Sequence, residues 1–159
     1  MRGDRARLAD RANGLLAQGR FTEAEAVIRE LLARDPREPE ALLLSGRALL
    51  LQRRCEEAEA RFREHLEVDA DSLNGLTQLA LSLLCQQRWS DAVPILERSL
   101  TLKPDLAQAH ANLGLARARL GDVDGAIRGY QDALRCQPGD PAHHAALGEL
   151  YAKAGDRAR

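Results

Sequence analysis

Apolar residues follow a helical period along most of the chain. In one well-defined stretch they stand at Leu113, Ala116 and Leu120, and the same steps of three and four residues resume after Gly121. This spacing places the apolar side chains on one face of an α-helix. Because the pattern of helix, short break and helix fills the chain, it predicts an all-α protein built from antiparallel helix pairs.

The pattern also repeats at an interval of 34 residues, which makes a repeat architecture the first hypothesis. One column of the repeat holds only alanine, at Ala24, Ala58, Ala92 and Ala126. A second column holds small residues, at Ala12, Gly46, Ala80, Gly114 and Gly148. A third holds large apolar residues, at Ile28, Phe62, Leu96 and Tyr130. The columns predict one repeat domain over residues 1–159, with units 5–38, 39–72, 73–106 and 107–140 and a partial unit 141–159.

The breaks between the two helices of each unit stand in the same column. They fall at Gly19–Arg20, Arg53–Arg54, Gln87–Arg88 and Gly121–Asp122. A glycine at such a break can adopt the left-handed conformation that ends a helix. In the first unit, Thr22 followed by Glu25 predicts a capping box at the start of the second helix.

With small residues at two fixed places in each unit and proline near the end of three of the four units, at Pro36, Pro104 and Pro138, the chain resembles the tetratricopeptide repeat family. The fourth unit matches best, through Leu113, Gly114, Gly121, Ala126, Tyr130, Ala133 and Pro138. The resemblance implies an α-solenoid, a right-handed superhelix of about four and a half repeats. It also implies a protein–protein interaction scaffold whose concave groove binds a peptide or helix of a partner protein.

Carrying the family's groove positions across by register implies a set of peptide-binding residues. The set comprises Asn13, Leu43, Leu44, Arg47, Asn74, Thr77, Gln78, Leu81, Gln108, Asn112, Leu115 and Arg119. Amides can hydrogen-bond a peptide backbone, and leucines can receive side chains. Two alternatives stay open: the amides are ordinary solvated side chains, and the leucines pack within the superhelix. The lysines with which one subgroup of the family clamps a terminal carboxylate are absent.

Charge and composition narrow the class of partner. The formal net charge is −1, from 23 basic and 24 acidic residues, and aromatic residues make up 3%. Neither a basic surface nor stacking platforms for bases are expected, so the partner is a protein and not nucleic acid. No apolar run approaches the length that spans a bilayer. A cytoplasmic protein is expected, and the preference for arginine over lysine suggests a bacterium with a GC-rich genome.

The sequence offers little chemistry beyond binding. No nucleophile–base, P-loop or HExxH pattern appears, so we expect no enzyme and no cofactor. His110 and His144 share a column but lack further metal ligands. The three cysteines stand far apart and are expected to be small apolar side chains in a reducing compartment. Trp89 belongs to an apolar column and is expected in the core.

The last helix raises alternatives for function. The chain ends at Arg159, where the second helix of a fifth repeat is expected. We therefore expect the apolar face of segment 142–154 to be incompletely covered. One expectation is therefore self-association through this end, as in a self-assembling structural repeat protein. The other is that the chain is the N-terminal part of a longer protein, such as a glycosyl- or sulfotransferase in which the repeats position a protein substrate.

Overall fold

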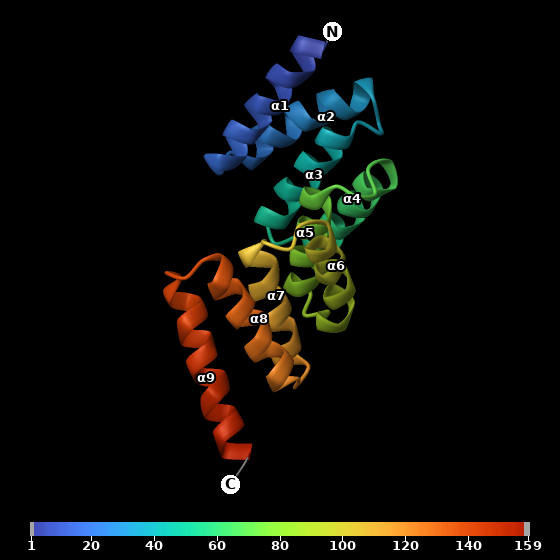
Figure 1. Ribbon diagram of the computed structural model, residues 1–159. Coiled ribbons are helices and arrows are strands. Elements are labelled where there is room, and N and C mark those ends of the chain that lie inside the picture. The colour runs from blue at the N-terminus through green and yellow to red at the C-terminus, as the bar shows by residue number, and fades with distance from the viewer. Residues whose placement is uncertain (1, 158–159) are drawn as a thin grey trace. The chain divides into compact units, whose positions relative to one another are not determined.

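The computed structural model describes residues 2–157 and contains nine α-helices and no β-strand within that range (Figure 1). The all-α class predicted from the hydrophobic period is therefore confirmed. The chain divides into two compact units, Met1–Gln86 and Gln87–Arg159. The boundary lies inside the third predicted repeat, in the loop between its two helices.

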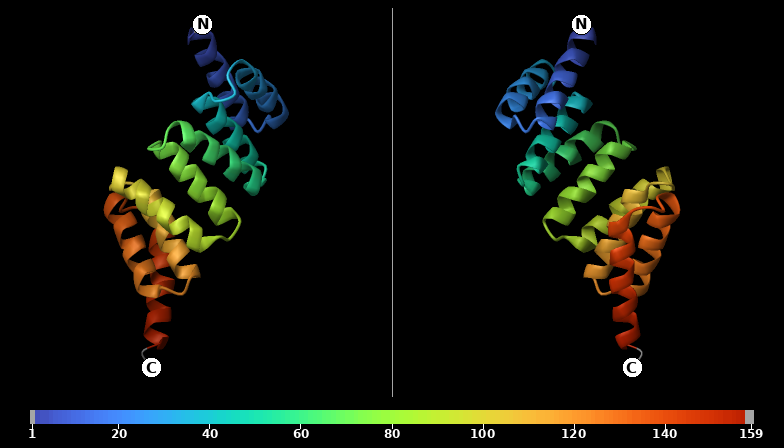
Figure 2. Two further views of the ribbon diagram at one scale, coloured as in Figure 1. Left: turned by 90° about the vertical axis from the view of Figure 1, so that its right-hand side faces the viewer. Right: turned by 90° about the vertical axis from the view of Figure 1, so that its left-hand side faces the viewer.

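The first unit consists of five helices. They are α1 (Arg2–Ala17), α2 (Phe21–Arg34), α3 (Pro39–Leu51), α4 (Cys55–Val68) and α5 (Leu73–Cys85). Loops of three or four residues join them, and connections this short make consecutive helices antiparallel neighbours. In this unit α1 packs on α2 and α3, α4 packs on α3 and α5, and α3 also contacts α5 (Figure 2).

The second unit consists of four helices. They are α6 (Trp89–Leu102), α7 (Ala107–Arg119), α8 (Val123–Cys136) and α9 (Pro141–Arg157). Each packs on the next in the chain. The core around α8 contains Ala126, Tyr130 and Ala133, and Leu150 of α9 packs into the same cluster.

The corner between the two helices of each pair has one conformation throughout. Gly19, Arg53, Gln87 and Gly121 have φ of 71°, 63°, 59° and 85°. The left-handed residue thus recurs every 34 residues, at the predicted breaks. Two of the four are not glycine, although an L-residue with a side chain is less stable in this conformation by roughly 1–2 kcal/mol.

The capping box predicted at Thr22 and Glu25 is wrong, because α2 already begins at Phe21 and Thr22 lies in its first turn. The residue before α2 makes no side-chain cap. Side-chain caps occur instead on several other helices. At α5, for example, Ser72 Oγ accepts a hydrogen bond from the backbone N–H of Gly75 at 3.1 Å.

The small columns lie where paired helices cross. The alanine column is fully buried in all four repeats. A Cβ atom on Gly46 would collide with the ring of Phe62. A Cβ atom on Gly129 would lie 2.7 Å from Cα of Gly114, so the α7 and α8 backbones touch. Helix axes approach this closely only when the crossing point lacks bulk.

The expectation that the three cysteines are separate side chains is wrong for two of them. Cys55 at the start of α4 and Cys85 at the end of α5 form a disulfide, with their Cα atoms 6.1 Å apart. Cys136 is free and exposed. The wide sequence separation hid the pair, because only the packing of α4 against α5 brings the two residues together.

The recurring corner leads to a stability prediction. Gly19→Ala and Gly121→Ala should each lower the free energy of unfolding by about 1 kcal/mol, because alanine is strained at positive φ. An added Cβ meets nothing within 4 Å at either site, so the loss reports the backbone conformation alone. Arg53→Gly and Gln87→Gly should conversely raise stability by about 0.5–1 kcal/mol.

Urea denaturation of each variant measures the change, and Gly14→Ala is the matched control. Gly14 lies within α1, where a Cβ also meets nothing within 4 Å, so this substitution should stabilise the protein. Equal effects of Gly14→Ala and Gly19→Ala would contradict the role assigned to the corner.

Candidate functional site

In the first unit, the predicted groove residues lie on α1, α3 and α5. Leu44 is 1% exposed and belongs to the core with Ala41 and Ala48, so its side chain is not available to a ligand. Leu43 and Leu81 are half-buried. The register assigned both Leu43 and Leu44 to the groove, and of the two only Leu43 has a partly exposed side chain.

Some polar members of the set already bind each other. The guanidinium of Arg47 on α3 donates to the side-chain oxygen of Asn13 on α1 at 2.7 Å. The hydroxyl of Thr77 donates to the carbonyl oxygen of Leu73 within α5 at 2.7 Å. In contrast, Asn74 is exposed and Gln78 is half-buried. These two amides on α5 are the polar groups of this surface best placed to bind a ligand.

In the second unit, Gln108 and Asn112 form a pair on α7. The amide of Gln108 donates to Oδ1 of Asn112 at 3.1 Å. Asn112 is only 7% exposed, and its Nδ2 has no hydrogen-bond partner among the residues that the structure describes. A buried donor without a partner lowers stability by about 1–3 kcal/mol. Because this Nδ2 atom is buried, a ligand cannot reach it in this conformation.

The other two predicted residues of α7, Leu115 and Arg119, line a cavity of about 380 Å³. The remaining lining residues are Ala118 of α7, Tyr130 of α8, and Ala146, Glu149, Leu150 and Lys153 of α9. The cavity therefore has an apolar floor and a charged rim. Its size is sufficient for one or two large side chains of a ligand.

The charged residues on the rim of this cavity, Arg119, Glu149 and Lys153, are exposed to solvent. Arg119 stacks over the ring of Trp89, with its guanidinium carbon 5.4 Å from the ring centroid. Trp89 is only half-buried, so the expectation that it lies in the core is wrong. Burial raises the pKa of Tyr130, with a smaller opposing effect from Arg119, so its hydroxyl stays protonated near neutral pH. With Lys153 and Glu149, the rim carries a net charge of +1.

The sequence reasoning missed the contribution of α9 to this cavity. Glu149 and Lys153 stand 34 residues after Leu115 and Arg119, so the same register extended into the partial unit would have identified them. Tyr130 was assigned only to packing. Its ring lines the cavity because α8 packs on both α7 and α9.

A second cavity, of about 410 Å³, lies between α2, α3 and α4. Much of its rim is charged, and several of these charges pair with each other. Arg54 lies 2.6 Å from Glu57, and Arg61 lies 2.9 Å from Glu64. This cavity therefore offers fewer free groups to a ligand than the cavity between α7, α8 and α9.

Two histidines that share a column of the repeat form hydrogen bonds to backbone carbonyls. Nε2 of His110 lies 2.8 Å from the carbonyl oxygen of Pro104, and Nε2 of His144 lies at the same distance from that of Pro138. In the described part of the chain, no cluster of histidine, cysteine and carboxylate side chains could hold a metal ion. Within residues 2–157, no helix has the length and apolar character needed to cross a bilayer.

Comparisons with solved structures support the fold described above. MamA from residue 41 to its end, from Desulfovibrio magneticus RS-1, is 25% identical, with a TM-score of 0.88 over 96% of this chain and 87% of that one. A double mutant titled MamA RS-1 ArsTM gives the same identity and TM-score, over 96% and 86% of the two chains. Pseudomonas aeruginosa PilF is 21% identical, with a TM-score of 0.87 over 96% of this chain and 69% of that one.

The sequence comparisons identify the family. No curated protein matches the chain significantly. A family model described as the tetratricopeptide repeat matches residues 9–74 and 77–141. These two segments cover most of the chain and follow the 34-residue period found in its sequence. The α-solenoid class is thereby confirmed, and the chain belongs to the tetratricopeptide repeat family.

Proposed function

We propose that the chain is a protein-interaction scaffold that binds a peptide or helix of a partner protein. The proposed binding surface is formed by the first helix of a repeat, as opposed to its second helix. Its family membership and its solved structural neighbours support an interaction scaffold in general. The cavity between α7, α8 and α9 is the observation that carries the specific proposal. Two of the predicted groove residues line it, Leu115 at its floor and Arg119 at its rim. The proposed role is binding and not catalysis.

The chemistry of the cavity favours one kind of ligand side chain. Its floor of Leu115, Tyr130 and Leu150 suits a large apolar side chain. Arg119 and Lys153 on the rim outweigh Glu149 and favour a carboxylate next to that side chain. A short peptide in such a surface binds with a dissociation constant on the order of micromolar.

The first binding prediction concerns the rim. Peptides selected from a random library on the purified chain should contain a large apolar residue beside an acidic one. Lys153→Glu should weaken the binding of such a peptide about tenfold, because it replaces attraction by repulsion at the carboxylate. Fluorescence anisotropy with the selected peptide measures the dissociation constant.

The matched control is Arg128→Glu, which makes the same reversal of charge on an exposed residue of α8 outside the cavity. It should change the dissociation constant less than twofold. Equal weakening by the two variants would show that the peptide senses only net charge and would contradict binding in the cavity.

The second binding prediction concerns Asn112. Asn112→Leu removes the buried donor that has no partner, so the free energy of unfolding should stay unchanged or rise by up to about 1 kcal/mol. Peptide binding should stay unchanged, because the buried Nδ2 is not accessible to a ligand. Thermal denaturation and anisotropy together measure the two effects.

Ser99→Ala is the contrasting control, because Ser99 is buried with its hydroxyl bonded to the carbonyl oxygen of Leu96 at 2.7 Å. This substitution should not raise stability and should leave binding unchanged. Weaker binding by Asn112→Leu with unchanged stability would contradict the burial of this amide and would place it on the ligand surface.

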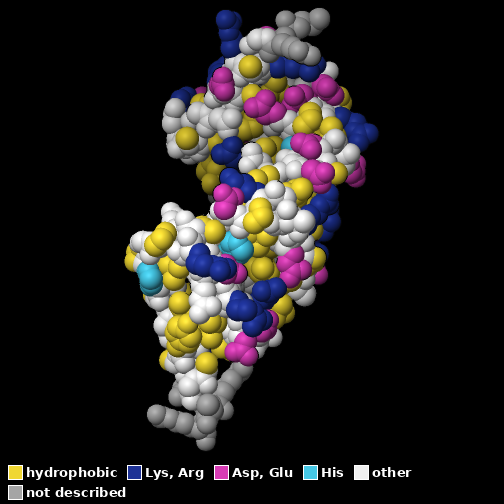
Figure 3. Space-filling model, in the orientation of Figure 1, with side chains coloured by type: hydrophobic (Ala, Val, Ile, Leu, Met, Phe, Trp, Pro, Cys, Tyr) yellow, Lys and Arg dark blue, Asp and Glu magenta, His cyan; other side chains and the backbone are white. Residues whose placement is uncertain are grey.

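A second candidate function, self-assembly, is favoured by α9. Tyr151 is 50% exposed and Leu147 is half-buried beside it, and Figure 3 shows apolar side chains gathered over this helix. Self-assembly predicts a sedimentation coefficient that rises with protein concentration. Tyr151→Lys should abolish the rise and Ala145→Lys, also exposed on α9, should not. A constant monomer value for the unsubstituted chain would rule this function out.

A further inference from the structure

A covalent bond joins two helices of the first unit at one corner. The disulfide between Cys55 and Cys85 links the first residue of α4 to the last residue of α5. The repeat itself does not require cysteine at either place. The residues in the column of Cys55 are Phe21, Trp89 and Val123, and those in the column of Cys85 are Ala17, Leu51 and Arg119. The pair is therefore a feature of this corner alone.

We infer that Cys55 and Cys85 form a reversible thiol–disulfide exchange site that controls the mobility of the end of α5. The consequence for binding rests on the proposed function, because α5 carries Asn74, Gln78 and Leu81 of the candidate surface. Leu81 lies one turn before Cys85.

The exchange proceeds with a low-molecular-weight disulfide as oxidant. The Cys85 thiolate attacks one sulfur of the oxidant, forms a mixed disulfide and releases one thiolate. The Cys55 thiolate then attacks the sulfur of Cys85 and releases the second. Two protein thiols and one disulfide thus become one protein disulfide and two free thiols. Reduction by two equivalents of thiol is the reverse reaction.

The exposure of the two residues assigns their order of reaction. Cys55 is 4% exposed, whereas Cys85 is half-buried. An external thiol therefore reaches the sulfur of Cys85, and Cys55 is the leaving group. Sγ of Cys55 lies 3.4 Å from the carbonyl oxygen of Arg53. In the reduced state this oxygen is in place to accept a hydrogen bond from the Cys55 thiol.

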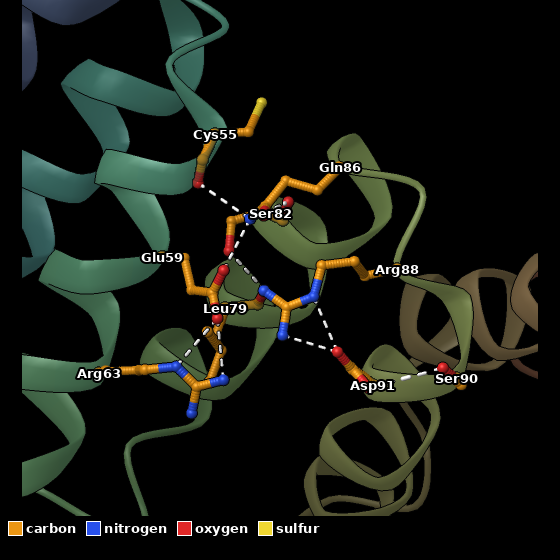
Figure 4. A network of polar contacts seen from close by, with 9 residues as sticks. All are labelled: Cys55, Glu59, Arg63, Leu79, Ser82, Gln86, Arg88, Ser90 and Asp91. Carbon is orange, nitrogen blue, oxygen red and sulfur yellow. Dashed lines mark hydrogen bonds and ion pairs between the residues drawn. The ribbon is translucent and has the colours of Figure 1, made fainter.

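A polar network crosses the same corner and remains after reduction (Figure 4). Nε2 of Gln86 donates to the carbonyl oxygen of Cys55 at 3.3 Å and to Oε2 of Glu59 at 2.8 Å. The other carboxylate oxygen of Glu59 accepts from Arg63 at 2.9 and 3.0 Å. Because these bonds hold the corner without the disulfide, reduction loosens the end of α5 and does not unfold the unit.

Labelling of the full chain tests whether the site exists. The exposed Cys136 would itself react with glutathione disulfide, so the test uses the Cys136→Ser variant. The variant is first incubated with glutathione disulfide, and N-ethylmaleimide is then added in denaturant so that it also reaches the buried Cys55. The oxidised variant should take no adduct, and the variant treated with phosphine reductant and denaturant should take two. Two adducts on the oxidised variant, or glutathione retained on Cys85, would overturn the inference.

Hydrogen exchange tests the consequence for α5. In the reduced chain, amides in the last two turns of α5 should exchange at least about tenfold faster than in the oxidised chain. Closing a loop of this length should also raise the melting temperature by on the order of 10 °C. Cys85→Ser should reproduce the reduced state under both conditions, and Cys136→Ser should behave as the unsubstituted chain.

These readouts separate the inference from the proposed function. Exchange in α5 that is identical in the oxidised and reduced chains would overturn the control of mobility, whether or not a peptide binds. If oxidation changes the exchange in α5 but no selected peptide binds to either form, the proposed function fails and the exchange site stands.

Discussion

The close approach of paired helices at small side chains is the constraint on which the rest of the structure depends. At the crossing of α7 and α8, a Cβ atom on Gly129 would lie 2.7 Å from Cα of Gly114, and Ala126 beside them is fully buried. Because the backbones touch there, the large residues of the pair are directed toward neighbouring helices. Tyr130 accordingly packs in a cluster with Leu150 of α9. One helix pair thus supplies part of the core of the next.

The same constraint arranges the candidate surface. Within each of the two compact units the helix pairs nest in a fixed register, so that residues 34 positions apart on neighbouring first helices lie close together. Asn13 and Arg47 are such residues, and they are hydrogen-bonded. Arg119 and Lys153 are another such pair, and both line the cavity between α7, α8 and α9. Within a unit, the repeat therefore brings residues 34 positions apart to the same part of the surface.

The residues that sequence reasoning left open or assigned wrongly share a cause. For Leu44 the groove and the core were both open and it lies in the core, while Trp89 was placed in the core and is a half-buried ring with a stacked arginine. Cys55 and Cys85 were treated as separate residues and are bonded. In each case the outcome depends on a contact with another helix, and the period along one helix contains no information about the distance to the next. Glu149 and Lys153 differ, because the register would have identified them.

The sequence by itself determined the helical class, the repeat interval, the corner positions and the small residues at the crossings. These features follow from short-range rules: the period of a single helix, the conformation of a single corner residue and the bulk of a single side chain. Their repetition four times over makes each assignment independent of any one residue. The tertiary structure alone decided which groove positions face outward, which cysteines are joined and where a cavity remains. Those outcomes depend on how side chains from different helices fill the space between them, and a difference of a few ångströms in helix position changes the answer.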